Sequence, residues 1–85
     1  MKEYEVLEEL LDLAEKLELE IRRGKLGGEG GCICKIKGKT VLFVDDDASD
    51  EDSVANVAEA LAGVDGIDDM FVMPQVREIL DANRG

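Results

Sequence analysis

The sequence contains no histidine, the side chain that most often transfers protons and binds zinc in enzymes. Catalytic triads with a histidine base and zinc sites with imidazole ligands are therefore excluded. The sequence also offers no nucleophile beside a base, so we expect neither an enzyme nor a bound cofactor. Tryptophan is absent too, and Tyr4, Phe43 and Phe71 are the only aromatic residues. The core must consequently be aliphatic.

Long apolar runs and excess positive charge are missing as well. No stretch approaches the ~20 apolar residues that span a bilayer. The chain has 21 acidic and 10 basic residues, a net charge of −11, which repels phosphate backbones and anionic lipid. We therefore expect no nucleic-acid and no membrane partner. The N-terminal residues show no secretion-signal pattern, and this favours a cytoplasmic location.

The 85 residues, 45% of them hydrophobic, predict one small domain over residues 1–85. A core of this size leaves a net stability on the order of 5 kcal/mol. Self-association would add to that stability, and we predict a homodimer.

Residues 2–23 carry apolar side chains at helical spacing. At 100° per residue these side chains fall within about half of the helical wheel, which is wider than one packed face requires. We expect this stripe to cover the rest of the same domain, with a helix–helix dimer seam as the alternative. Its members are Tyr4, Val6, Leu7, Leu10, Leu11, Leu13, Ala14, Leu17 and Ile21.

A glycine-rich segment at residues 27–31 leads into a predicted hairpin. Alternation places Cys32, Cys34 and Ile36 on one strand face, Gly38 suits a tight turn, and residues 40–44 are a β-branched second strand. We expect the helices to cover the cysteine face and to bury both cysteines as small hydrophobic residues.

The alternative for Cys32 and Cys34 is a thiolate metal or redox site, half of a tetrahedral ligand set. A disulfide between them is disfavoured, because period-2 neighbours in a strand lie more than ~6 Å apart. Glu29, inside the glycine-rich segment, is a minor candidate for a catalytic carboxylate.

Six carboxylates follow the second strand within eight residues: Asp45, Asp46, Asp47, Asp50, Glu51 and Asp52. They precede a helix that we predict to reach residue 62, with Ser49 or Asp50 as its cap. Acidic residues stabilise a helix start in their own right. The alternative is a divalent-cation site at Asp45, Asp47 and Asp50, with or without hydrolytic activity, although the spacing is not that of an EF-hand.

Four apolar residues, Met70, Phe71, Val72 and Met73, precede the only proline, Pro74. The residue before a proline avoids helix, and the proline itself suits the first turn of a helix. We expect the four residues to form an extended segment that closes the core. An exposed surface for a partner protein is the alternative.

Together these patterns predict an α+β domain of order αββαα, in which an antiparallel β-hairpin packs against amphipathic helices. The best functional hypothesis is a non-catalytic protein-interaction or oligomerisation module. The alternative hypothesis is a divalent-metal-binding protein that uses the acidic cluster.

The hairpin pattern G-x-x-C-x-x-x-G-x-x-x-x-x-x-D, between a long helix and a second helix, resembles the core of ImmA/IrrE-type metallopeptidases. In that family the second helix carries His-Glu-x-x-His, whereas residues 57–62 here read VAEALA. The resemblance thus implies a relative without the zinc-binding histidines. The segment GGEGGCICKIKGKTVLFVD also resembles small uncharacterised bacterial proteins of similar length.

Overall fold

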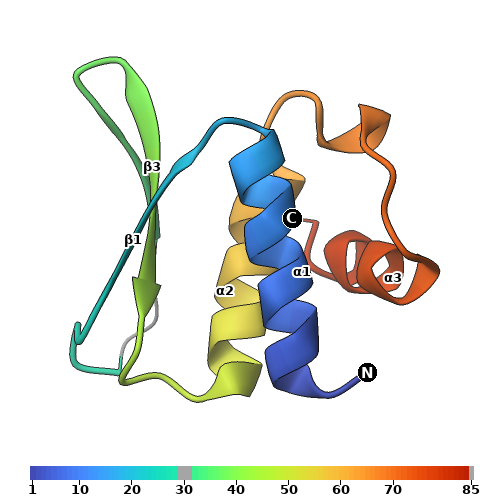
Figure 1. Ribbon diagram of the computed structural model, residues 1–85, viewed down its shortest axis with the longest axis horizontal. Helices are drawn as coiled ribbons and strands as arrows, with labels where there is room; N and C mark the ends of the chain where they lie inside the picture. The colour runs from blue at the N-terminus through green and yellow to red at the C-terminus, as the bar shows by residue number, and fades with distance from the viewer. Residues whose placement is uncertain (29–31, 85) are drawn as a thin grey trace.

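The computed structural model describes residues 1–28 and 32–84, and Figure 1 shows how their elements are arranged. In chain order these elements are α1 (Glu3–Lys16), β1 (Glu20–Gly24), β2 (Cys32–Ile36), β3 (Lys39–Asp45), α2 (Asp50–Ala62), the 3-10 helix η1 (Ile67–Asp69) and α3 (Pro74–Ala82).

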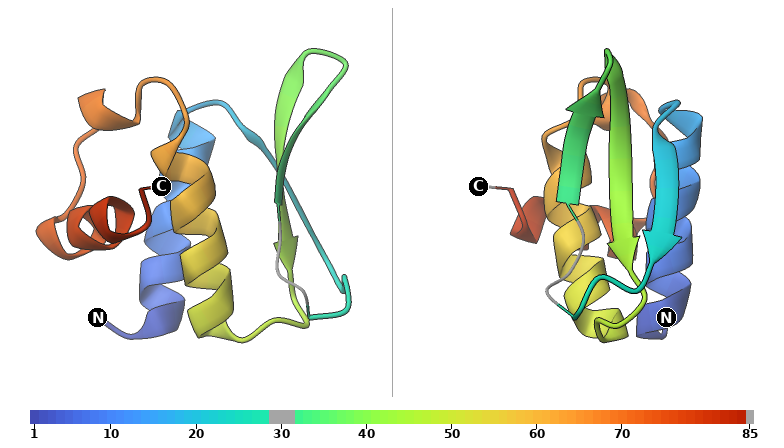
Figure 2. Two further views of the ribbon diagram at one scale, coloured as in Figure 1. Left: turned by 180° about the vertical axis from the view of Figure 1, so that it is seen from behind. Right: turned by 90° about the vertical axis from the view of Figure 1, so that its left-hand side faces the viewer.

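The elements form layers. Helices α1 and α2 lie side by side against one face of the sheet, and α3 lies on the far side of this helix pair (Figure 1). No helix of the described residues lies over the other face of the sheet (Figure 2). The α+β class is thus confirmed, with one strand more than the predicted order contains.

The extra strand is β1, and the prediction of a single helix over residues 2–23 is wrong beyond Lys16. Glu18 adopts a left-handed φ of 63°, and Glu20–Gly24 then runs extended, parallel to β3. Leu17, Leu19 and Ile21 alternate with polar residues, so the pattern fits a strand as well as a helix. Hydrogen bonding to β3 resolves this ambiguity, and Gly24 ends a strand instead of following a helix.

The sheet has the order β1-β3-β2, with β3 in the centre and β2 antiparallel to it. Lys37 and Gly38 form the hairpin turn with φ values of 51° and 82°. Positive φ at both positions matches the twist of the flanking strands, and glycine adopts it without strain. The predicted antiparallel hairpin is confirmed.

The core is aliphatic, as predicted, and lies between the sheet and the helices. It includes the α1 stripe from Val6 to Ala14, the inward side chains of β3 and α2, and Val76 and Leu80 of α3. The stripe contacts α2, β1 and α3 of the same chain. The apolar side chains beyond a single packed face are therefore buried within the same chain. Of the stripe, only Tyr4 is exposed, at 54%.

Both later helices begin as predicted. The Ser49 hydroxyl accepts a hydrogen bond from the Asp52 amide at 3.1 Å and caps α2, which ends before Gly63. Pro74 is the first residue of α3 and follows Met73, whose φ of −58° and ψ of 143° are not helical. Among the described residues, no helix has the length and apolar character needed to cross a membrane.

The packing at Leu10 gives the first testable prediction. This side chain is fully buried in α1, so Leu10→Ala should leave a cavity and lower the free energy of unfolding by about 2–5 kcal/mol. Urea denaturation followed by circular dichroism measures the loss. Leu26→Ala, at a side chain 48% exposed, is the control and should change stability by less than about 0.5 kcal/mol. Equal effects of both substitutions would contradict the described core.

Candidate functional site

The carboxylate of Asp45, at the end of β3, is only 1% exposed and organises the loop that follows β1. Its Oδ1 accepts hydrogen bonds from the amides of Leu26 and Asp47, both at 2.9 Å, and its Oδ2 accepts one from Gly28 at 2.8 Å. Both oxygens are thus engaged by backbone N–H groups. Such bonds to a charged acceptor are about twice as strong as neutral ones.

The neighbouring aspartates have separate structural contacts. Asp47 Oδ2 accepts a hydrogen bond from the Gly27 amide at 3.1 Å, and Asp46 pairs with Arg23 at 3.3 Å. Asp50 begins α2, directly after the capping residue Ser49. Gly27 and Gly28 have φ values of 95° and 85°, which glycine adopts without a steric penalty, so the loop can present its amides to these carboxylates.

Of the predicted cation ligands Asp45, Asp47 and Asp50, the first two accept hydrogen bonds from loop amides. Within residues 1–28 and 32–84, no three acidic or cysteine side chains converge on a point that could hold a metal ion. The cation site at this cluster stays a prediction from the sequence, with no geometry in its favour. Glu29, the other carboxylate candidate, lies outside the described residues.

The cysteines occupy the opposite face of the sheet from the one predicted. Cys32 lies opposite Phe43 and Cys34 opposite Val41, whereas the helix-facing side chain Leu42 lies opposite Ile33. Cys32 is exposed and Cys34 half-buried, so the prediction of two buried cysteines is wrong. Alternation correctly placed both on one face, but it does not specify which face the helices cover.

The two thiols are close together on the uncovered face. Their Sγ atoms lie 3.6 Å apart, in contact as an S–H donor and a sulfur acceptor. The hydrogen bond with Cys34, then slight burial and the Cys34 charge, raise the pKa of the Cys32 thiol above its usual value of 9.0. Cys32 is therefore predominantly protonated at neutral pH.

The segment Met70–Met73 divides into inward and outward side chains. Met70 and Val72 are half-buried and pack against the core, which confirms for these two residues that the segment closes the core. Phe71 is 89% exposed and Met73 42% exposed, contrary to that expectation but in agreement with the exposure that the alternative predicted. The extended backbone explains the alternation, because successive side chains point to opposite sides.

A hollow of about 230 Å³ lies next to this segment, against the polar side of α1. Its lining combines both elements and consists of Glu9, Asp12, Leu13, Lys16, Phe71, Val72 and Met73. An exposed aromatic ring and an adjoining hollow are thus present on the same surface of the molecule.

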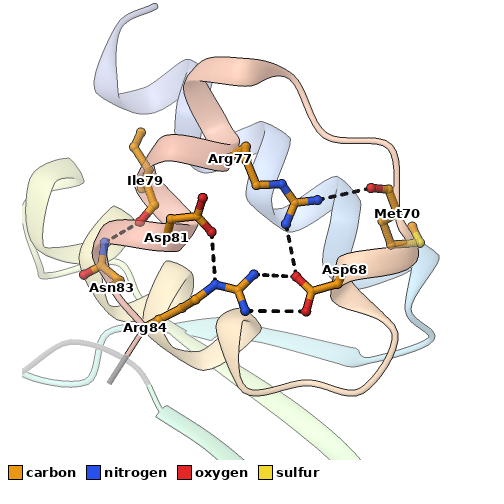
Figure 3. A network of polar contacts seen from close by, with 7 residues as sticks. All are labelled: Asp68, Met70, Arg77, Ile79, Asp81, Asn83 and Arg84. Atoms are coloured by element: carbon orange, nitrogen blue, oxygen red, sulfur yellow. Dashed lines mark hydrogen bonds and ion pairs between the residues drawn. The ribbon is translucent and has the colours of Figure 1, made fainter.

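A network of polar contacts joins Met70, the first residue of this segment, to residues on both sides of the segment (Figure 3). Arg77 of α3 donates to the Met70 carbonyl at 3.4 Å and to Asp68 at 3.3 Å, and Arg84 also donates to Asp68. The Arg84 hydrogen bond is the main cause that lowers the pKa of Asp68, with Arg77 adding to it. The pairs are therefore present at neutral pH and are lost as the pH falls through this lowered value.

Sequence reasoning missed two features of these surfaces, the contact of the two sulfur atoms and the role of Asp45. The contact of the two sulfur atoms depends on side-chain orientation, which the sequence does not specify. The role of Asp45 had a signal in the sequence, because an aspartate that closes a buried strand beside a glycine-rich segment can accept the backbone amides of that segment.

The chain matches no protein-family model, and neither a curated protein nor a solved structure is significantly similar to it. The resemblance to ImmA/IrrE-type metallopeptidases and to small bacterial proteins therefore stays a prediction.

The Asp45 contacts predict a specific loss of stability. Asp45→Asn removes the charge and turns an N–H₂ group toward amide donors, so the free energy of unfolding should fall by roughly 1.5–3 kcal/mol. Hydrogen exchange should accelerate at the amides of Leu26, Gly28 and Asp47. Asp46→Asn, which changes one exposed ion pair, is the matched control and should cost at most about 1 kcal/mol. Unchanged exchange at the three amides would refute the role of Asp45.

The thiol contact predicts a change in reactivity. Cys34→Ala removes the hydrogen bond and the neighbouring charge, so the pKa of Cys32 should fall and its thiolate fraction at pH 8 should rise. The rate of alkylation by iodoacetamide, followed by mass spectrometry, should then increase at Cys32. Ile36→Ala, on the same strand, is the control and should leave the rate unchanged. A slower reaction in Cys34→Ala would show that the contact does not hold the proton on Cys32.

Proposed function

We propose that this protein is a non-catalytic protein-interaction module that associates with a second copy of itself in the cytoplasm, through the segment Met70–Met73. One observation carries the proposal: the Phe71 ring is 89% exposed on a segment whose neighbours are anchored in the core and in the Arg77 contacts. Large exposed aromatic side chains are typical anchors of protein interfaces.

The hollow beside Phe71 favours a second copy as the partner. In a two-fold symmetric dimer the same surface serves both subunits, so each Phe71 can enter the hollow of the partner subunit. Burying one such ring contributes about 1.5–3 kcal/mol, and two rings about twice that. Even with a further contribution from the flanking Met73, this free energy corresponds to a weak dimer and not to a nanomolar dissociation constant.

Charge sets the conditions under which such a dimer forms. Each chain carries a net charge of −11, and Glu9 and Asp12 lie on the rim of the hollow, with Lys16 as the only basic residue of its lining. Two copies therefore repel at long range. Salt screens this repulsion, and we expect the dimer to strengthen as the ionic strength rises.

The net charge of −11 also repels nucleic acid and anionic membranes, and we exclude both as main partners for this reason. The two free cysteines fit a reducing compartment such as the cytoplasm. The divalent-metal alternative at Asp45, Asp47 and Asp50 has no supporting contact geometry, and titration calorimetry with Mg²⁺, Ca²⁺ and Mn²⁺ remains its direct test.

The decisive variant is Phe71→Ser. Sedimentation velocity at micromolar to millimolar protein concentration should show a monomer–dimer equilibrium for the wild type, with more dimer at high salt. Phe71→Ser should weaken dimerisation at least about tenfold, the loss of more than 1.4 kcal/mol. Because the ring is exposed in the monomer, the variant should retain its melting temperature.

Leu26→Ser is the matched control, since it also replaces an exposed apolar side chain, in the loop after β1. It should dimerise like the wild type. A wild-type chain that stays monomeric at the highest concentration and salt, or a Phe71→Ser variant that dimerises equally, would overturn the proposal.

A further inference from the structure

The thiol pair on the uncovered sheet face is independent of the Phe71 surface and has its own chemistry. Cys32 and Cys34 lie on β2, an edge strand, and the face that carries them has no helix over it (Figure 2). The sulfur atoms are thus accessible from solution while the strand backbone is held by its pairing with β3.

The spacing of the two cysteines in the strand suits a shared ion better than a direct bond. A disulfide needs about 2.05 Å between the sulfurs. The observed 3.6 Å is a non-bonded contact of two thiols, whereas in an extended strand two residues span about 6.6 Å, near the upper limit for a disulfide. Two thiolates bound at about 2.3 Å to one ion lie about 3.8 Å apart at a tetrahedral angle, and farther apart as that angle opens. Small side-chain rotations are therefore sufficient to chelate an ion.

The number of donors selects the kind of ion. No third cysteine, histidine or carboxylate joins the pair within the described residues, so the four-ligand set that structural zinc requires is not formed there. Soft thiolate ligands select Cu(I), zinc and iron–sulfur clusters, and of these Cu(I) is the one that two or three thiolates satisfy. The net charge of −11 also attracts cations and repels anionic thiol reagents.

We propose that Cys32 and Cys34 form a bidentate dithiolate site for a soft monovalent cation, Cu(I), with one ion bound per chain on the uncovered face of the sheet. Binding releases the thiol protons, and a small thiol from solution completes the coordination. The backbone of β2 does not move, and the ion stays at the surface, where transfer to another thiolate protein is possible.

The test uses the reduced full chain under anaerobic conditions, titrated with Cu(I) in competition with the coloured chelator bathocuproine disulfonate. One Cu(I) per chain should be withdrawn from the chelator. Cys32→Ser and Cys34→Ser should each lower the Cu(I) affinity at least about 100-fold. Loss of a residue that only hydrogen-bonds to a metal ligand costs about 10–100-fold, and loss of the ligand itself should cost more. Ile36→Ser, an exposed position on the same strand, is the matched control and should bind like the wild type.

Two results would overturn the proposal. The first is no withdrawal of Cu(I), or equal withdrawal by the double variant lacking both cysteines. The second is one ion per two chains with a doubled mass, which would assign the thiols to a four-thiolate site shared between copies. A parallel titration with Co²⁺ identifies that case by its tetrahedral absorption bands. Repeating the titration on Phe71→Ser separates copper binding from dimerisation, and we expect the same affinity.

Discussion

The hydrogen bonding of residues 26–28 to the end of β3 and the residues just after it is the constraint on which the other features depend. Because β1 runs parallel to β3, residues 25–28 leave β1 at the carboxyl end of the central strand. Backbone amides that cross a strand end need acceptors. Asp45 supplies them at that point, and the Asp46 amide in turn donates to the Gly24 carbonyl at 2.8 Å. The buried carboxylate of Asp45 thus holds the chain that leaves β1 against the end of β3.

This constraint also explains why the acidic cluster does not behave as its composition suggests. A carboxylate with both oxygens on backbone donors is oriented toward the loop, and a cation there would have to displace those amides. The later acidic residues serve the start of α2, where the helix dipole and the Ser49 cap favour them. Six carboxylates in eight residues thus divide between a loop and a helix start. Local density of ligand-type residues is a weak indicator of a metal site for this reason.

The parts of the fold that depend on local chemistry were predictable from the sequence. Ser49, Gly63, Pro74 and the Lys37–Gly38 turn determine where elements begin and end through their own backbone and side-chain preferences. The strand β1 was not predictable, since Leu17 and Ile21 satisfy a helical spacing and a strand alternation equally, and a partner distant in sequence decides. The exposed cysteines follow from that third strand, because the helix-facing side of β2 is set by the register of the whole sheet.

The two surfaces that the fold leaves unused lie on opposite sides of the α1–α2 layer. The cysteines lie on the sheet face opposite the core residue Leu42, whereas the segment before α3, which contains Phe71, is on the far side of the helices (Figures 1 and 2). Residues that far apart, without shared contacts, act additively on stability and binding. A change at one surface therefore reaches the other only through the core between them, which is aliphatic and fully packed at Leu10 and Leu61. Copper binding and self-association are accordingly expected to be two separable properties of one small scaffold.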